Sequence, residues 1–162
     1  MVYRNIMKKI PKHIEDYASN ANYYIEASEK FVYPNHQAVK LLLLLTAWEN
    51  IKIAEEELSA FIQKTIPVKE LHKSHAYKFI KAPGIARVEV RSKGMKAINT
   101  FYKSPEDFEK LIYICRYGPK SGQRNLNLIF KNGWFLDHFE NSLISKINWY
   151  NISVKMYKEF EN

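Results

Sequence analysis

The sequence predicts a mainly α-helical protein of about five helices, with a small β-hairpin near residues 126–136 as an additional element. Apolar residues recur at three- and four-residue steps over long stretches, which is the periodicity of an amphipathic helix. These stretches begin and end at residues that favour helix termini. Glycine and proline, which interrupt helices, number only 5 and 6 among 162 residues. A chain of this length fits one domain, and we expect residues 1–162 to form it.

Three helices are predicted in the first half of the chain. The first covers about residues 12–31 and ends at the Tyr33-Pro34-Asn35 turn, and the second covers about 36–63. The short loop between them predicts antiparallel packing. A third helix is expected over residues 67–81, because Ala82-Pro83-Gly84 stops it firmly.

The second half of the chain mixes helix and strand signals. Residues 85–99 fit either a short strand or a frayed helix. Ser104 followed by proline and two acids predicts the start of a fourth helix, which ends before Tyr117. Asn132-Gly133 between two apolar runs predicts the hairpin turn. The last helix is expected over about 137–157, with an apolar side formed by Phe139, Leu143, Ile144, Ile147, Ile152 and Met156.

Positive charge is concentrated in one third of the chain. The net charge is +8, and the segment 69–103 carries nine basic and two acidic residues, which is +7 of that total. A concentrated positive field attracts polyanions, among which nucleic acid is the commonest. A lysine-rich solvated surface is the alternative interpretation.

Several classes of protein are disfavoured by what the sequence lacks. Cys115 is the only cysteine, so no intramolecular disulfide forms, and we expect a buried thiol on the fourth helix. The amino terminus has no apolar signal-peptide core, and the longest apolar run, Leu41–Leu45, is too short to span a bilayer. We therefore expect a cytoplasmic protein without a membrane partner. No phosphate-binding loop, nucleophile elbow or zinc-protease motif is present, and no cofactor or metal is expected.

A polar stripe interrupts the apolar face of the second predicted helix. Leu42, Leu45, Glu49, Lys52 and Glu56 fall on one narrow face. Buried charges must be paired, and Glu49 and Lys52 are three residues apart, so they can reach each other or a group on the facing helix. The stripe indicates either a polar cleft that binds a ligand or a surface ion pair where the helix emerges into solvent.

The third predicted helix supplies candidate partners for that stripe. His72 and His75 lie on one helical face, with Lys78 beside His75. Such a histidine pair holds a metal only with further ligands, for which Glu49 or Glu56 is suitably placed. Solvated or hydrogen-bonded histidines are the favoured interpretation.

The first two predicted helices also resemble a known family. The chain has Ala18-Ser19-Asn20-Ala21, then Ala27, a proline-containing turn, Ala38, and Leu44-Leu45-Thr46-Ala47-Trp48-Glu49-Asn50-Ile51-Lys52, followed by Ser74-His75-Ala76-Tyr77-Lys78. Over residues 12–80 this is similar to the AbiV-type abortive-infection family. That family has an Asn-Ala pair, a Glu-Glu-x-x-Lys signature and a His-Lys-rich motif. It is similar in architecture to the HEPN group of helical proteins, many of which are metal-independent ribonucleases.

The chain departs from the family pattern at two points. Trp48 replaces the first glutamate of the signature, which leaves Glu49 and Lys52 as the matching pair. The arginine-to-histidine motif of HEPN ribonucleases is absent from the sequence.

Three functional hypotheses follow from the residues and the resemblance. The leading one is an AbiV-like antiviral-defence protein that binds a viral or host macromolecule, RNA or protein, through a polar cleft. The second is an endoribonuclease in which His75 is the acid or base and Lys78, Arg87 or Arg91 stabilises the developing charge. The third is a non-catalytic nucleic-acid-binding protein, and a homodimeric scaffold is a structural alternative. The candidate catalytic residues are thus His75 and Lys78, and the candidate binding residues are Glu49, Lys52, Glu56, His72, Arg87 and Arg91.

Overall fold

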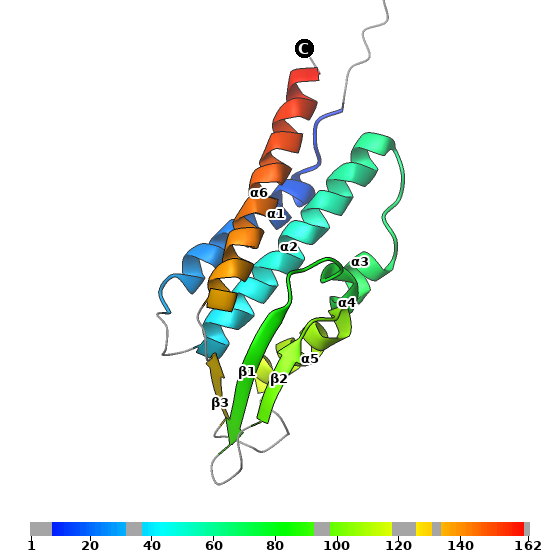
Figure 1. The fold of residues 1–162 in the computed structure, drawn as a ribbon. Coiled ribbons are helices and arrows are strands. Elements are labelled where there is room, and N and C mark those ends of the chain that lie inside the picture. Colours follow the sequence, from blue (N-terminus) through cyan, green and yellow to red (C-terminus); the bar gives the residue numbers. More distant parts are fainter. Residues whose placement is uncertain (1–7, 32–36, 93–97, 118–125, 131–133, 161–162) are drawn as a thin grey trace, which may run out of the picture.

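Four longer helices, two short helices and three strands make up the part of the chain that the structure describes, residues 8–31, 37–92, 98–117, 126–130 and 134–160. In this computed structural model the elements are, in chain order, α1 (Lys12–Ser28), α2 (Gln37–Gln63), α3 (Glu70–Lys73), α4 (His75–Lys78), β1 (Ile85–Ser92), β2 (Ile98–Tyr102), α5 (Pro105–Tyr117), β3 (Leu126–Phe130) and α6 (Trp134–Phe160) (Figure 1). The predicted mainly helical class is confirmed.

The central element is α2, which contacts each of the other five helices and also β3. Its leucine run, residues 41–45, is apolar on every side, which suits a helix surrounded by other elements. The buried residues of α2 are accordingly spread around the helix and include Leu41, Leu44, Leu45, Ala47, Trp48, Ile51, Ala54 and Leu58. Within the described residues, no helix combines the length and the apolar character that a membrane crossing requires.

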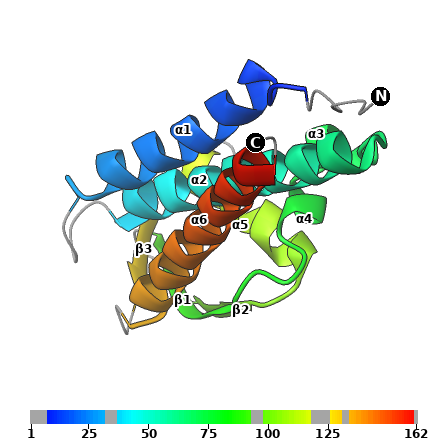
Figure 2. The ribbon, with the colours of Figure 1, turned by 90° about the horizontal axis from the view of Figure 1, so that it is seen from above.

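The antiparallel packing of the first two helices is confirmed. In Figure 2, α1 and α2 lie side by side and run in opposite directions. The buried face of α1 consists of Ile14, Ala18, Ala21, Ile25 and Ser28, as the helical spacing predicts. Two alanines on this face leave room for the helices to approach closely, and this contact fixes one wall of the core.

The third predicted helix is wrong as a continuous element. The segment expected over 67–81 contains two short helices, α3 and α4, because Ser74 between them is extended, with φ −117° and ψ 120°. The Ser74 hydroxyl accepts a hydrogen bond from the amide of Tyr77 at 3.1 Å. Serine therefore acts as an amino-terminal cap that starts a new helix, and the chain changes direction before His75.

The ambiguous segment 85–99 contributes strands, and the predicted local hairpin at 126–136 is wrong. The three strands form an antiparallel sheet in the order β2-β1-β3, so β1 is central and β3 pairs with β1. Residues 126–130 are a strand, but the chain is already helical at Trp134, and no strand follows β3 among the described residues. The predicted Asn132-Gly133 turn lies outside the described residues. The pairing that β3 makes is distant in sequence, which the local pattern does not reveal.

The start of α5 follows its sequence signals closely. The Ser104 hydroxyl accepts a hydrogen bond from the Asp107 amide at 3.2 Å, and the Asp107 carboxylate accepts from the Ser104 amide at 3.1 Å. This reciprocal cap satisfies amide groups that would otherwise lack partners at the helix start. It places Phe108, Leu111 and Ile112 in the core, where Phe108 stacks on Phe79.

The last helix is longer than predicted and buries a different face along its second half. Phe139, Leu143 and Ile147 are buried as expected, followed by Tyr150 and Tyr157. The side chains of Ile144, Ile152 and Met156, expected on the apolar side, are exposed. The buried face continues through Tyr150 and Tyr157. The prediction missed them because tyrosine is less hydrophobic than isoleucine or methionine.

Candidate functional site

The candidate site is centred on Glu49, a glutamate buried in the middle of α2. Only 7% of Glu49 and 7% of Lys78 is exposed to solvent. One carboxylate oxygen, Oε2, lies 2.6 Å from His75 Nδ1 and 3.3 Å from Lys78 Nζ. A carboxylate oxygen accepts hydrogen bonds, so in this contact His75 carries its proton on Nδ1 and donates it to Glu49. The structure thus brings Glu49, His75 and Lys78 together, as the sequence predicts.

The short helix α4 brings both partners to Glu49. Its four residues begin at the Ser74 cap, so His75 and Lys78 project from the same turn. The Trp48 indole Nε1 donates a hydrogen bond to the Lys78 carbonyl at 2.9 Å, which ties α4 to α2 next to Glu49. Trp48, which stands where the resembled family has a glutamate, therefore anchors the helix that carries the site.

Exposure separates the roles of the two residues on α4. Lys78 is buried and its ammonium faces Glu49, whereas we expected Lys78 to stabilise charge on a ligand. The His75 side chain is 40% exposed while its Nδ1 is bound. Its other nitrogen, Nε2, accepts a hydrogen bond when the ring is neutral and donates one when the ring is protonated. His75 is the member of this cluster that reaches solvent.

Of the two partners predicted for Glu49, the structure has the group on the facing helix and not Lys52. Lys52 Nζ lies 3.9 Å from Glu56 Oε1, one turn further along α2. The same Glu56 oxygen accepts a hydrogen bond from the Tyr77 hydroxyl at 2.7 Å. This bond to Glu56, together with burial, raises the pKa of Tyr77 to about 12, so the phenol remains a donor at neutral pH. Lys52 and Glu56 form a second polar group beside the Glu49 cluster.

His72 lies in a third group that is separate from His75. Its Nε2 is 2.6 Å from Glu57 Oε1, and the other Glu57 oxygen is 3.9 Å from His13 Nε2 on α1. The ring of Tyr17 lies near the His72 ring, with 6.0 Å between their centroids. This group connects α1, α2 and α3.

The two histidines of the predicted pair thus bond to different carboxylates. In the described part of the chain, no three histidine, cysteine, aspartate or glutamate side chains are arranged to hold a metal ion. His72 and His75 are therefore hydrogen-bonded histidines, which was the predicted alternative to a metal site.

Arg87 and Arg91 both lie on the central strand β1. Their side chains lie outside what the structure describes, and their part in the site remains a prediction.

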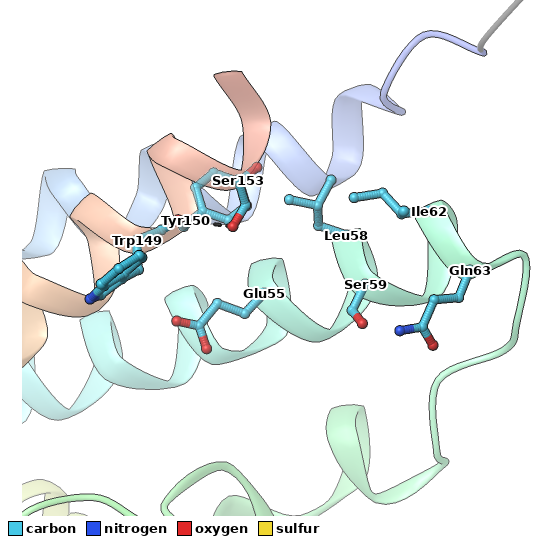
Figure 3. Close-up of a pocket in the computed structure, with 8 residues that line it drawn as sticks. All are labelled: Glu55, Leu58, Ser59, Ile62, Gln63, Trp149, Tyr150 and Ser153. Carbon is cyan, nitrogen blue, oxygen red and sulfur yellow. Dashed lines mark hydrogen bonds between the residues drawn. The ribbon is translucent and has the colours of Figure 1, made fainter. Parts of the chain in front are cut away.

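Two pockets lie near the polar groups, and neither is lined by Glu49, His75 or Lys78. The larger, of about 310 Å³, lies between α2 and α6 (Figure 3). It is lined by Glu55, Leu58, Ser59, Ile62 and Gln63 of α2 and by Trp149, Tyr150 and Ser153 of α6. The smaller, of about 200 Å³, includes Glu56 and Tyr77.

Cys115 takes no part in these groups. It is partly buried against the core, and burial raises the pKa of its thiol to about 12. The protonated thiol is a poor nucleophile, which agrees with the predicted buried cysteine.

Sequence reasoning missed Glu57, Tyr77 and the Glu55–Lys146 ion pair between α2 and α6. A signal for them exists in the run Glu55-Glu56-Glu57. Successive helical residues point 100° apart, so three adjacent glutamates on a surrounded helix must meet three different neighbours. Here those neighbours are α6, α4 and α3.

Comparison of the chain with protein-family models, with curated proteins and with solved structures finds no match.

Proposed function

We propose that this chain is an antiviral-defence protein similar to the AbiV type, which binds a viral or host macromolecule at the surface around His75. The observation that carries the proposal is the Glu49 carboxylate that holds both His75 and Lys78. The positions that match the family motifs, Glu49, His75 and Lys78, are the ones that meet in this cluster. Lys52, the fourth matching residue, lies on the neighbouring turn of α2.

The cluster suits recognition because it fixes an exposed imidazole. A buried ion pair is costly to form, and it is retained where it gives a defined geometry. Lys78 balances the charge of Glu49, and Glu49 in turn sets the orientation of the His75 ring. A ligand that meets His75 therefore meets a group whose rotational freedom is already restricted, which lowers the entropic cost of binding.

The charge distribution supports an RNA as the macromolecule. The segment 69–103, which contains α3, α4, β1 and β2, carries +7 of the net charge of +8. Phosphate contacts from such a segment are sequence-independent and weaken steeply with added salt. Arg87 and Arg91 on β1 remain our candidates for these contacts.

A metal-independent endoribonuclease is a second candidate, favoured by the His75–Glu49 bond. A histidine oriented by a carboxylate is the usual arrangement of a general base. In this scheme His75 Nε2 removes the proton from an RNA 2′-hydroxyl, whose oxygen attacks the adjacent phosphorus. The bond from phosphorus to the 5′-oxygen breaks, which leaves a 2′,3′-cyclic phosphate on one fragment, and the 5′-oxygen leaves as a hydroxyl after it takes a proton from water. Arg87 or Arg91 then stabilises the charge on the phosphoryl oxygens. The absence of the arginine-to-histidine motif places this candidate second.

We further propose cytoplasmic action and a homodimer. The support for the homodimer is an exposed apolar stripe on α6, formed by Trp149, Ile152, Met156 and Phe160. These residues share one helical face, and apolar stripes of this kind commonly mark interaction surfaces.

A plaque assay on a host that expresses the protein tests the function. Wild type is expected to reduce plaque number, and His75→Ala is expected to lose that protection while it still folds. Tyr23→Ala, at an exposed position on α1, is the matched control and should protect fully. Full protection by a folded His75→Ala protein would contradict the proposal.

A denaturing gel of labelled single-stranded RNA, with chelator present, separates the two candidates. Intact RNA that binds in a salt-dependent way supports the binding protein. Shortened RNA that disappears with His75→Ala supports the nuclease.

A further inference from the structure

The apolar stripe on the second half of α6 forms a face of its own, separate from the face that packs on the core. Between 45% and 77% of each residue is exposed in the set Trp149, Ile152, Met156 and Phe160. At 100° per residue these four side chains lie within about 80° of one another. The buried residues of the same half, Tyr150 and Tyr157, point about 110° away from the middle of the stripe.

The area of the stripe matches what a dimer interface needs. Large apolar side chains have roughly 150–250 Å² each, so these four expose on the order of 500 Å² together. A standard protein–protein interface buries about 800 Å² per partner, of which about 56–65% is apolar. The stripe therefore supplies the whole apolar share of one side of such an interface.

The order of side chains along the stripe is self-complementary in an antiparallel pair. In the sequence, the midpoint of Trp149 and Phe160 falls next to the midpoint of Ile152 and Met156. A two-fold axis at this point brings each Trp149 onto the partner's Phe160 and each Ile152 onto the partner's Met156. The positive end of one helix macrodipole then lies beside the negative end of the other, whereas a parallel pair brings like ends together.

An antiparallel pair of this kind leaves the sheet of each copy uncovered. The second half of α6 and the sheet lie at opposite ends of the molecule (Figure 1). Because β3 ends at Phe130 and α6 begins at Trp134, the sheet adjoins the amino-terminal end of α6. About 20 residues of helix separate Trp134 from the axis, which is about 30 Å at 1.5 Å per residue. The two sheets of the dimer are therefore about 60 Å apart, one at each outer end.

We infer that α6 pairs antiparallel with α6 of a second copy, and that the dimer holds one RNA strand at both of its basic segments. This inference rests on the proposed function, to which it adds the interface and the two-point binding. Each outer end carries β1 and β2 of the basic segment 69–103. At about 3.4 Å per nucleotide of a stacked strand, about 18 nucleotides span the distance between them.

Sedimentation velocity over a concentration series tests the interface. Wild type is expected at twice the chain mass of 19.2 kDa, and the double variant Trp149→Ser, Met156→Ser is expected at the mass of one chain. Ile144→Ser, at an exposed position of α6 outside the stripe, is the matched control and should stay dimeric. A monomeric wild type, or a dimer of the double variant, would overturn the interface.

A distance between spin labels tests the orientation of the two helices. Asn141 is exposed on the first half of α6, so Asn141→Cys in a Cys115→Ala background carries one label per chain. Antiparallel pairing about the proposed axis places the two labels about 40 Å apart. A parallel pair would place them within about 20 Å, because packed helices lie only 8–10 Å apart. Double electron–electron resonance separates these outcomes, and the shorter distance would refute the antiparallel arrangement.

Two RNA lengths test the two-point binding. An RNA of about 10 nucleotides is too short to bridge the two ends, so wild type and the double variant should bind it equally. An RNA of about 40 nucleotides should bind wild type at least tenfold more tightly than the double variant, because the second contact is then intramolecular.

The possible failures of this experiment are distinguishable. Equal affinities of the two proteins for the long RNA would overturn the two-point binding. Weaker binding of the short RNA by the double variant would place Trp149 on the RNA and overturn its assignment to the interface. If neither protein binds the short RNA, RNA is not the ligand, and both the proposed RNA binding and the two-point binding fail. The interface is then decided by sedimentation and by the label distance alone.

Discussion

Two glutamate–histidine pairs with the same 2.6 Å separation connect α2 to the α3–α4 segment, and they differ in their surroundings. Glu49 and His75 meet beside a buried lysine, whereas Glu57 and His72 meet beside a second, exposed histidine. The first pair therefore lies within a buried ion pair, and the second is a partly exposed link between helices. Hydrogen-bond length alone does not rank two such pairs, because burial and the third partner decide what each pair contributes to stability.

The largest difference is expected when each glutamate is removed. Glu49→Ala leaves the Lys78 ammonium buried without a counter-charge, and the free energy of unfolding should fall by about 3–5 kcal/mol. Urea denaturation followed by circular dichroism measures this change. A loss below about 1 kcal/mol would mean that the Lys78 ammonium reaches solvent in the variant. The Glu49 pair would then contribute no more to stability than the exposed Glu57 pair.

A double substitution checks the reason for that loss. Glu49→Gln with Lys78→Met removes both charges together, so it should cost much less than the sum of the single substitutions. Additive losses would show that the two residues do not interact.

The second pair should give a much smaller effect. Glu57→Gln weakens the contacts to His72 and His13, whose side chains are 44% and 60% exposed. Partly exposed ion pairs contribute at most about 1 kcal/mol, so the free energy of unfolding should fall by no more than that. The same urea titration serves here, and a loss as large as that of Glu49→Ala would remove the contrast.

Asp107 is a third carboxylate, and it accepts hydrogen bonds from backbone amides. The Ser104 and Lys103 amides hold the pKa of Asp107 below its ordinary value of 3.8. A lowered folded-state pKa contributes stability above the unfolded-state value, and that contribution is lost as the pH falls through the folded-state value. Asp107→Asn should therefore cost about 1 kcal/mol or less at pH 7, and the cost should shrink below about pH 4. Thermal unfolding of both proteins across this pH range measures the stability cost of the substitution. A cost that does not change with pH would contradict this explanation.

The starts of helices could be predicted, because they depend on residues that are adjacent in the sequence. Pro11 precedes α1 and Ser104 caps α5, so these helices begin where the sequence places them. The Ser74 cap is also a local signal, but it lies within an otherwise helical pattern that favoured a single helix. The sheet could not be predicted in this way, because β1 pairs with a strand more than thirty residues further along the chain.

For the candidate site, the residues could be predicted from the sequence but their contacts could not. Glu49, His75 and Lys78 could be selected because a charged residue on a core-facing stripe demands a partner. The sequence left two partners open for Glu49, Lys52 on the same helix or a group on the facing helix, because spacing alone does not decide between them. His75 and Lys78 reach Glu49 through tertiary packing, which the Trp48 bond to the Lys78 carbonyl secures.

We propose that the Glu49 pair presents a histidine that binds RNA, whereas the Glu57 pair connects helices. RNA binding by His75→Gln and His72→Gln, measured by fluorescence anisotropy on folded protein at low salt, tests this claim most directly. We predict that His75→Gln loses most of the affinity and that His72→Gln keeps the affinity of wild type. Equal affinities of the two variants, or a loss confined to His72→Gln, would contradict the account.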